Sequence, residues 1–296
     1  MKKRLRRTMM FLSAHKASLI KDAYVYQPDS LIFDLEDAVA ENQKDSARIM
    51  LYNLLKSIDY KGIERVVRIN GIHTKHFKED IRAAVAGGVD TVRVPETQSA
   101  DDIILVETEI AKAEKEFGVP VGQTLLMGAI ETPLGVINAY SIATSSERIM
   151  GISFGAGDFV RTMHATRTKS SIELLGARSQ VLIAARAAGV MCFDTVHTDF
   201  TDEEFLRREV QMIKDMGFDG KSVVNPKQIS VIHEIFAPTQ KEIERAEKEI
   251  HALGGNAEQG VGVFTIDGQM LDIAMLEGAK RTIALAKASG VYKGDL

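Results

Sequence analysis

The stretch Leu31-Ile-Phe-Asp-Leu-Glu-Asp37 is a short apolar run that ends in acidic residues. Similar runs, rich in β-branched residues, recur along the chain and alternate with longer amphipathic segments. Runs that are apolar throughout, rather than at every second position, are typical of parallel strands covered on both faces. We therefore predict eight strands, at Met9–Leu12, Leu31–Leu35, Arg65–Ile69, Thr91–Val94, Thr124–Ile130, Ile149–Phe154, Met191–Val196 and Ser222–Val224.

The segments between the strands have the periodicity of amphipathic helices. Two of them follow a threonine with glutamate three residues later, Thr201 with Glu204 and Thr239 with Glu242, which is the spacing of a capping box. Strands that alternate with helices in this way predict an α/β fold, a (β/α)₈ TIM barrel. A doubly wound open sheet has the same local pattern and remains the alternative. The predicted helices include Ala100–Phe117, Pro133–Thr144, Glu173–Ala188 and Asp202–Met216.

The pattern changes beyond Asn225-Pro226. A charged helix from Gln240 to about Ala252 leads into a glycine-rich loop, 254–262, and a strand-like Val263–Ile266. A last helix follows from about Asp272 to Ala288. Because a barrel alone needs about 250 residues, we predict the barrel over residues 1–235 and a C-terminal helical extension over 236–296.

Composition restricts the class of protein. The net charge of −4 gives no general attraction to nucleic acid, and no apolar run is long enough to span a membrane. The single cysteine, Cys192, excludes an intrachain disulfide and is expected to be a buried, inert thiol. Without a secretory signal, a cytoplasmic protein is expected. One basic run stands out, Lys2, Lys3, Arg4, Arg6 and Arg7, and it is either a solvated tail or an anchor for phosphates.

Polar side chains end several of the predicted strands. Arg68 ends the third, Glu131 follows the fifth, and Asp158 follows the sixth after Gly155-Ala-Gly157. The carboxyl ends of barrel strands meet at one mouth, where several acids would repel one another without a cation. Oxygen donors without cysteine or clustered histidine favour Mg²⁺, which Glu131 and Asp158 could hold. The alternative is that each acid only caps the next helix.

A set of motifs resembles the citrate lyase β-subunit family, within the wider HpcH/HpaI aldolase/citrate lyase group. The resemblance runs from about Arg6 to Ala288. Its phrases are Phe33-Asp-Leu-Glu-Asp-Ala38, Val67-Arg-Ile-Asn70, Ala129-Ile-Glu-Thr-Pro-Leu-Gly135, Gly155-Ala-Gly-Asp-Phe159, Phe193-Asp-Thr-Val196, Gly217-Phe-Asp-Gly-Lys-Ser222 and Asn225-Pro-Lys-Gln-Ile229.

The resemblance implies a reaction and its partners. It implies Mg²⁺-dependent cleavage of a citryl thioester, on CoA or an acyl carrier protein, to oxaloacetate and an acetyl thioester. It also implies α and γ (carrier) subunits, and a homotrimer or hexamer in which the C-terminal extension is a lid on a neighbouring subunit.

The resemblance also implies roles for single residues. Glu131 and Asp158 match the metal carboxylates. Arg68 matches an arginine that contacts substrate and offsets charge on the thioester oxygen, and Asp272 matches the acid of the lid, which exchanges a proton with the enolate carbon. Glu36 and Asp37 are expected to hold metal-bound water or orient the base. The remaining expected contacts to substrate or CoA are Arg7, Gly155 and Ala156.

The chain departs from the family at three places. Leu12-Ser-Ala-His-Lys16 replaces a Val-Pro-Gly-Ala-Asn phrase, Glu96 replaces a lysine, and Gly157 replaces a glutamate. Lys16 and Glu96 together suggest a partial exchange of charge in the pocket. These changes keep open two alternatives, a lyase or thioesterase for malyl- or methylmalyl-type CoA esters and a non-catalytic family member.

Overall fold

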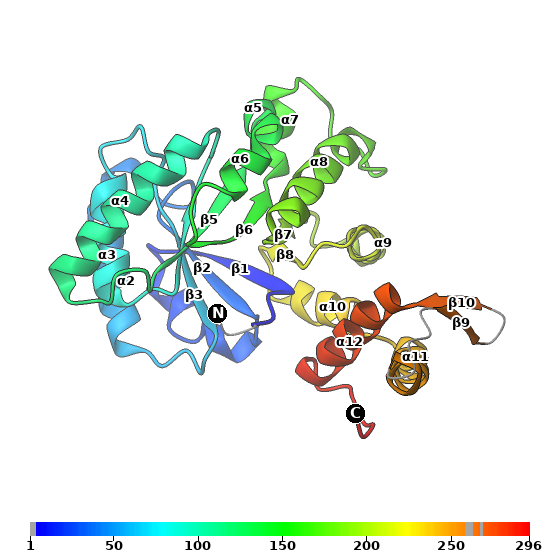
Figure 1. The fold of residues 1–296 in the computed structure, drawn as a ribbon. Helices are drawn as coiled ribbons and strands as arrows, with labels where there is room; N and C mark the ends of the chain where they lie inside the picture. Colours follow the sequence, from blue (N-terminus) through cyan, green and yellow to red (C-terminus); the bar gives the residue numbers. More distant parts are fainter. Residues whose placement is uncertain (1–3, 258–262, 267–268) are drawn as a thin grey trace. The chain divides into compact units, whose positions relative to one another are not determined.

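The structure is a computed structural model that describes residues 4–257, 263–266 and 269–296. Eight parallel strands close into a barrel in chain order, and β1 pairs with β8 (Figure 1). The predicted TIM barrel is thereby confirmed, and the open sheet is wrong. The strands are β1 Thr8–Ser13, β2 Ser30–Asp34, β3 Glu64–Arg68, β4 Thr91–Val94, β5 Leu125–Ile130, β6 Ile149–Phe154, β7 Met191–Asp194 and β8 Gly220–Val223.

Helices follow the strands and cover the outside of the barrel (Figure 1). The predicted helix Ala100–Phe117 has these bounds in the structure, where Ser99 and Asp102 form a capping box at its start. The helices are α1 Ala17–Ile20, α2 Lys44–Ser57, α3 Phe77–Gly87, α4 Ala100–Phe117, α5 Pro133–Ile137, α6 Ala139–Ala143, α7 Ala156–Thr162, α8 Ile172–Ala188, α9 Glu203–Met216 and α10 Lys227–Phe236, with 3₁₀ turns η1 Ala23–Tyr26 and η2 Glu41–Gln43.

Two local predictions are wrong. The segment 133–144 is not one helix, because Asn138 leaves helical geometry between α5 and α6 and its side chain donates to the Gln98 carbonyl at 2.8 Å. At the start of α9 the cap is Asp202, whose carboxylate accepts from the N–H of Phe205 at 2.9 Å. Thr201 instead donates its hydroxyl to Asp199 at 2.6 Å, so it makes no capping box.

The barrel interior is filled by a buried apolar layer. Its members come from six different strands and are 0–4% exposed: Met9, Ile32, Val66, Met127, Met150 and Phe193. Because side chains on a strand alternate between its faces, the residues two positions further along also point inward. The next layer toward the carboxyl ends therefore includes Phe11, Asp34 and Arg68, so it contains charged side chains.

The basic N-terminal run is neither a free tail nor an open anion site in its described part. Arg6 is 8% exposed, and its guanidinium donates to both carboxylate oxygens of Glu64 at 2.7 Å. Arg7 binds Asp29 through its main-chain N–H and its side chain. Both arginines precede β1, so these ion pairs close the amino-terminal end of the barrel.

The chain divides into two compact units, the first ending at Ile232 and the second running from His233 to the C-terminus. In the second unit Thr239 and Glu242 form the predicted capping box at the start of α11, Gln240–Ala257. The helix runs past the expected end at Ala252, because glycine weakens a helix without forbidding it. An antiparallel pair, β9 Val263–Ile266 and β10 Gln269–Asp272, leads into α12 Ile273–Ala288.

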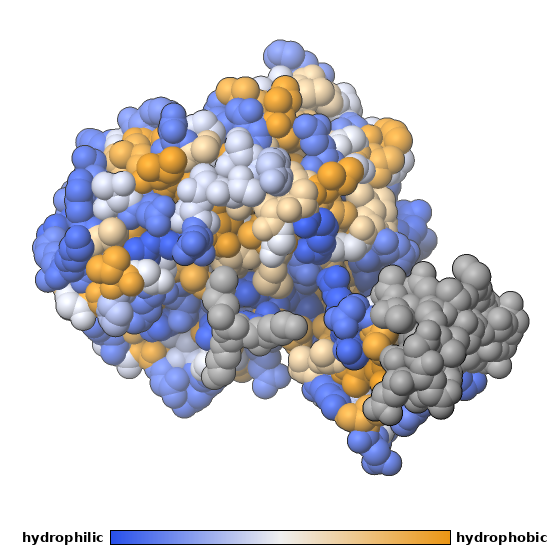
Figure 2. Space-filling model, viewed as in Figure 1, coloured by the Kyte–Doolittle hydropathy of each residue, from blue (hydrophilic) through white to orange (hydrophobic). Residues whose placement is uncertain are grey.

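The two long helices of the second unit share an apolar cluster of their own. Its members are Ile243, Ala246, Ala279, Ile283 and Ala286, all at most 5% exposed. On the viewed face of the molecule, exposed hydrophobic residues lie in separate patches among hydrophilic ones (Figure 2). Across the described residues, no helix is both long and apolar enough to cross a membrane.

Candidate active site

Three neighbouring strands present charged side chains at one level of the barrel mouth. The strand register pairs Asp34 of β2 with Arg68 of β3, and Arg68 with Arg93 of β4. The guanidinium carbons of both arginines lie 5.1 Å from the ring centre of Phe11, which forms the floor beneath them. The mouth thus has an aromatic floor with two cations on it.

Arg68 is held by carboxylates on every side. Its Nε and Nη2 each donate to Asp34 at 2.7 Å, in the bidentate geometry that suits a guanidinium. Its Nη1 lies 2.9 Å from Glu36, and Nη2 lies 3.4 Å from Asp37. Burial acts to raise the pKa of Asp34, but the bonds from Arg68 and from two main-chain N–H groups outweigh it and lower that pKa. Asp34 is therefore a fixed anion that orients Arg68.

The loop after β2 is built around this pair. Asp34 accepts the N–H groups of Glu36 and Ala38 at 3.0 and 3.1 Å, and the buried Lys44 ammonium donates to the carbonyls of Leu35 and Glu36 at 2.8 Å. Glu36 itself is mostly buried among acids. Burial, with Asp37, Glu131 and Asp34 nearby, raises the pKa of Glu36 to about 8 although Arg68 opposes the shift. A carboxyl with such a pKa can exchange a proton near neutral pH.

Glu131 follows β5 and is 5% exposed. Its Oε2 accepts the main-chain N–H of Glu96 at 2.9 Å, and its Oε1 lies 3.9 Å from Arg93. A Cβ at Gly155 would lie 2.6 Å from Glu131 Cγ and 2.7 Å from Oε1. Glycine at 155 therefore leaves the space that the Glu131 side chain occupies.

Asp158 stands in the first turn of α7, beyond the same glycine. Its side chain is 32% exposed and pairs with Arg161 at 2.8 Å. Burial raises the pKa of Glu131, and the negative charge of Asp158 adds to the increase while Arg93 opposes it. The two acids are therefore near enough to repel each other, which a bound cation would relieve.

The donor set fits magnesium. Among the described residues no three His, Cys, Asp or Glu side chains gather as a metal site. Mg²⁺ commonly takes only one or two carboxylates and fills its remaining positions with water and substrate oxygens. Glu131, positioned by a main-chain N–H and by the Gly155 backbone, together with the partly exposed Asp158, is such a pair.

A comparison with family models supports what this mouth suggests. Residues 7–226 match the model described as HpcH/HpaI aldolase/citrate lyase. The chain belongs to the HpcH/HpaI aldolase/citrate lyase family. That match spans the whole barrel, including Arg68, Glu131 and Asp158.

Individual members of the family narrow the comparison. The chain is 46% identical over 292 residues to the citrate lyase subunit beta of Leuconostoc mesenteroides subsp. cremoris, covering 99% of this chain and 97% of that protein. It is 32% identical over 286 residues to a (3S)-malyl-CoA thioesterase of Cereibacter sphaeroides, covering 97% and 96%. A solved structure of protein CitE from Mycobacterium tuberculosis, in complex with magnesium, acetoacetate and coenzyme A, has a TM-score of 0.78 and 28% identity, covering 97% of this chain and 100% of that chain.

The structure brings most of the expected site residues of this family member together. Arg68 contacts both Glu36 and Asp37, and Glu131 packs on Gly155, which precedes Ala156 and Asp158. It does not bring Arg7 there, because Arg7 precedes β1 and binds Asp29 at the amino-terminal end of the barrel. Asp272 ends β10 in the second unit, and its side chain lies outside the described part of the chain.

Two residues of the mouth were missed from the sequence. Asp34 orients Arg68, and Arg93 is the buried cation beside Glu131. Arg93 is 3% exposed, and burial lowers its pKa to about 10. Both stand in the last two residues of a predicted strand, and an ionisable residue inside such an apolar run was the available signal.

The residues at which the chain departs from the family pattern have different surroundings in the structure. Ser13 donates its hydroxyl to the Ala38 carbonyl at 2.8 Å, which ties the first loop to the second. Glu96 has a left-handed φ of 42° and lies 4.0 Å from Arg161. A Cβ at Gly157 would meet nothing within 4 Å. The exchange of charge that Lys16 and Glu96 suggested stays a prediction.

Proposed function

We propose that this chain cleaves a citryl thioester, carried by CoA or an acyl carrier protein, to oxaloacetate and an acetyl thioester. The hydroxyl proton leaves, the carbon–carbon bond beside it breaks, and the hydroxyl carbon becomes the ketone of oxaloacetate. The electron pair of the broken bond passes to the thioester as an enolate, which takes a proton to become the acetyl group.

The observation that carries this proposal is the buried carboxylate of Glu131. It lies against the backbone of Gly155, and the negative charge of Asp158 acts on it. We propose that Glu131 and Asp158 hold Mg²⁺. When bound, Mg²⁺ supplies Lewis-acid chemistry suited to the hydroxyl and carboxylate oxygens of a hydroxy acid. A solved relative contains magnesium and coenzyme A, which supports the same ligand classes here.

The other residues of the mouth have roles that follow from their contacts. Arg68, held by Asp34, offsets negative charge on the thioester oxygen. Glu36 and Asp37 orient water or the base, and the raised pKa of Glu36 suits proton transfer near neutral pH. The backbone at Gly155 and Ala156 borders the substrate. Asp272 donates the proton that the enolate carbon requires.

In this proposal Asp272 acts at the active site of a neighbouring subunit, so the active enzyme contains more than one copy of the chain. We propose that residues 236–296 form a lid that carries Asp272 to the barrel mouth of a neighbouring subunit, in a homotrimer or hexamer. The similarity to a citrate lyase β subunit also supports α and γ (carrier) subunits as partners. Sedimentation as a monomer would contradict the shared lid.

A second candidate is a lyase or thioesterase acting on malyl- or methylmalyl-type CoA esters. The 32% identity to a (3S)-malyl-CoA thioesterase over 97% of this chain favours keeping it. The two candidates differ in products. Citryl-CoA would release oxaloacetate, whereas malyl-CoA would release glyoxylate by carbon–carbon cleavage or free malate by hydrolysis of the thioester.

The deciding experiment measures these products from citryl-CoA and malyl-CoA with and without Mg²⁺. We expect oxaloacetate from citryl-CoA only when Mg²⁺ is present. Glu131→Gln and Asp158→Asn should lose Mg²⁺ binding in titrations while keeping their circular dichroism spectra, and Asp272→Asn should bind Mg²⁺ but lose turnover. Unaltered metal titrations in the first two variants would refute the metal assignment.

Glu147→Gln is the matched control. Glu147 is an exposed carboxylate in the turn before β6, at the amino-terminal end of the barrel, whereas both proposed ligands follow the carboxyl ends of their strands. The substitution Glu147→Gln removes one negative charge, as the ligand variants do, but leaves the barrel mouth unchanged. Its Mg²⁺ binding and turnover should therefore equal those of the wild type. Release of malate or glyoxylate, with no oxaloacetate from citryl-CoA, would favour the second candidate.

A further inference from the structure

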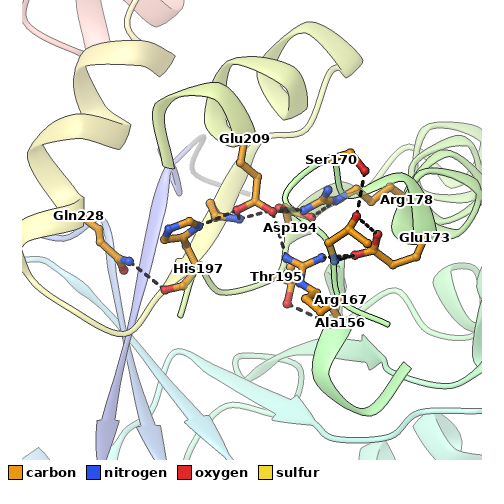
Figure 3. Close-up of polar contacts among 12 residues, drawn as sticks. Ala156, Arg167, Ser170, Glu173, Arg178, Asp194, Thr195, His197, Glu209 and Gln228 are labelled. Carbon is orange, nitrogen blue, oxygen red and sulfur yellow. Dashed lines mark hydrogen bonds and ion pairs between the residues drawn. The ribbon is translucent and has the colours of Figure 1, made fainter. Parts of the chain in front are cut away.

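A cluster of buried charges lies where the carboxyl end of β7 pairs with Lys221 of β8, and none of its members takes part in the chemistry proposed above. Asp194 accepts from Arg178 of α8 at 2.8 and 2.9 Å and from Lys221 of β8 at 2.7 Å. Glu209 of α9 contacts the same two cations, at 2.7 and 3.1 Å. The four side chains are 0% exposed, and Figure 3 shows the Arg178 guanidinium of α8 and the Glu209 carboxylate of α9 pointing toward Asp194 at the end of β7.

The cluster is completed by a histidine. His197 Nδ1 lies 3.1 Å from Glu209, and the His197 carbonyl accepts from Gln228 at 2.9 Å (Figure 3). Burial acts to raise the pKa of Glu209, but Lys221, His197 and Arg178 together lower it well below its ordinary value. Glu209 therefore stays ionised. The segment 194–197 is fixed at one end by the ion pairs of Asp194 and at the other by the contacts of His197 with Glu209 and Gln228.

Buried ion pairs of this kind are weak contributors to stability. The cost of removing two charges from water commonly matches or exceeds their attraction, so an apolar replacement would serve stability as well. What such a network gives in return is a unique arrangement of the groups that make it. The segment that this cluster fixes contains Thr195, between the anchored Asp194 and the anchored His197.

Thr195 connects the cluster to the proposed metal site. Its hydroxyl oxygen accepts the main-chain N–H of Ala156 at 3.0 Å, and both residues are 4% exposed (Figure 3). Ala156 is the first residue of α7, two positions before Asp158. The preceding Gly155 N–H donates to the Ile130 carbonyl at 2.9 Å. The start of α7 is thus held on one side by β5, which carries Glu131, and on the other by Thr195.

We propose that Thr195 is a positioning residue for magnesium binding, which sets Asp158 against Glu131 by fixing the start of α7, and that the Arg178–Asp194–Glu209–Lys221 cluster holds Thr195 for this purpose. The inference rests on the proposed function, because it assigns Asp158 to the metal. Thr195 itself touches neither metal nor substrate. Its effect passes through one hydrogen bond to the backbone.

The test replaces the threonine oxygen and leaves its shape. Thr195→Val keeps the volume and removes the acceptor, whereas Thr195→Ser keeps the acceptor. Loss of one buried hydrogen bond that leaves an N–H without a partner costs on the order of a tenfold change in an equilibrium constant. We expect Mg²⁺ titrations of the full-length protein to show about tenfold weaker binding for Thr195→Val, with Thr195→Ser close to the wild type. The turnover number of Thr195→Val should recover at saturating Mg²⁺.

Thr91→Val separates positioning from simple loss of stability. Thr91 is also fully buried, and its hydroxyl donates to Glu64 at 3.2 Å at the amino-terminal end of the barrel. Its replacement should lower the midpoint of thermal unfolding without altering Mg²⁺ affinity. Wild-type affinity in Thr195→Val, or equal weakening by Thr91→Val, would overturn this inference alone. A wild-type protein that binds no Mg²⁺ would overturn the proposed metal site and this inference with it.

Discussion

Replacing Gly155 by alanine should displace the proposed metal acid. The backbone at Gly155, with φ −114° and ψ 107°, is one that alanine adopts without strain. The added Cβ would nevertheless lie 2.6 Å from Glu131 Cγ, where carbon atoms normally stay about 3.5–4 Å apart. An overlap of roughly 1 Å in a packed interior costs about 1–3 kcal/mol.

The protein can relieve this overlap by turning Glu131 away. That movement breaks the bond from the Glu96 N–H, a hydrogen bond to a charged group worth about 1.5–3 kcal/mol. Gly155→Ala should therefore bind Mg²⁺ roughly 10- to 100-fold more weakly than the wild type. Its free energy of unfolding should fall by about 1–3 kcal/mol.

Gly157→Ala is the matched control two residues further along. A Cβ there meets nothing within 4 Å, and the residue lies inside α7. Alanine in a helix is favoured over glycine by about 0.5–1 kcal/mol, so this variant should be slightly more stable and bind Mg²⁺ normally. Urea unfolding and Mg²⁺ titration measure both quantities. Equal effects of the two substitutions on Mg²⁺ affinity and on the free energy of unfolding would refute the argument that steric overlap at position 155 displaces Glu131.

Three further predictions concern charge. The pKa of Glu36 is about 8 in the folded protein against 4.5 ordinarily, so between these pH values the folded state binds a proton that the unfolded state has lost, and the free energy of unfolding falls as the pH rises. Relative to Glu36→Gln, the wild type should lose up to about 1.4 kcal/mol of unfolding free energy per pH unit in this range. Urea unfolding that gives the two proteins the same dependence on pH would contradict this. Arg93→Met removes the cation that opposes the raised pKa of Glu131, so a proton should compete with Mg²⁺ more strongly and the loss of Mg²⁺ affinity relative to the wild type should grow as the pH falls. Mg²⁺ titrations in which the ratio of wild-type to variant affinity does not change with pH would contradict it. Lys221→Met leaves a carboxylate of the buried cluster undercompensated and should cost about 3–5 kcal/mol of unfolding free energy, whereas a loss below about 1 kcal/mol would argue against the cluster.

The barrel could be predicted because its signal is local and repeated. Most strands are largely apolar, and each bound falls within two residues of its prediction. One error arises from a contact distant in sequence, because the side chain of Asn138 reaches Gln98 and interrupts a helix whose own pattern is continuous. The other is local, because the neighbouring Asp202 rather than Thr201 takes the cap.

The sequence could predict which residues follow the strands and so lie at the barrel mouth, but not which of these side chains contact one another. Sequence position alone brings Glu131 and Asp158 to one mouth, yet it cannot show that Gly155 serves the Glu131 side chain. It cannot show that Asp34 is the partner of Arg68, since three acids follow each other closely there. Arg7 was expected near CoA from the family pattern, although an arginine before the first strand must lie at the other end of a parallel barrel.

The apolar cluster between α11 and α12 has a consequence for how the protein can change. Ile243 and Ile283, with their alanine neighbours, give the second unit a small interior of its own. The hairpin that ends at Asp272 joins these two helices. Substitutions in that hairpin can therefore alter the proposed proton donor without disturbing the strands that carry Glu131 and Arg68. Two halves of the proposed reaction would then adapt separately, the proposed donor in one folded body and the proposed metal carboxylates in the other.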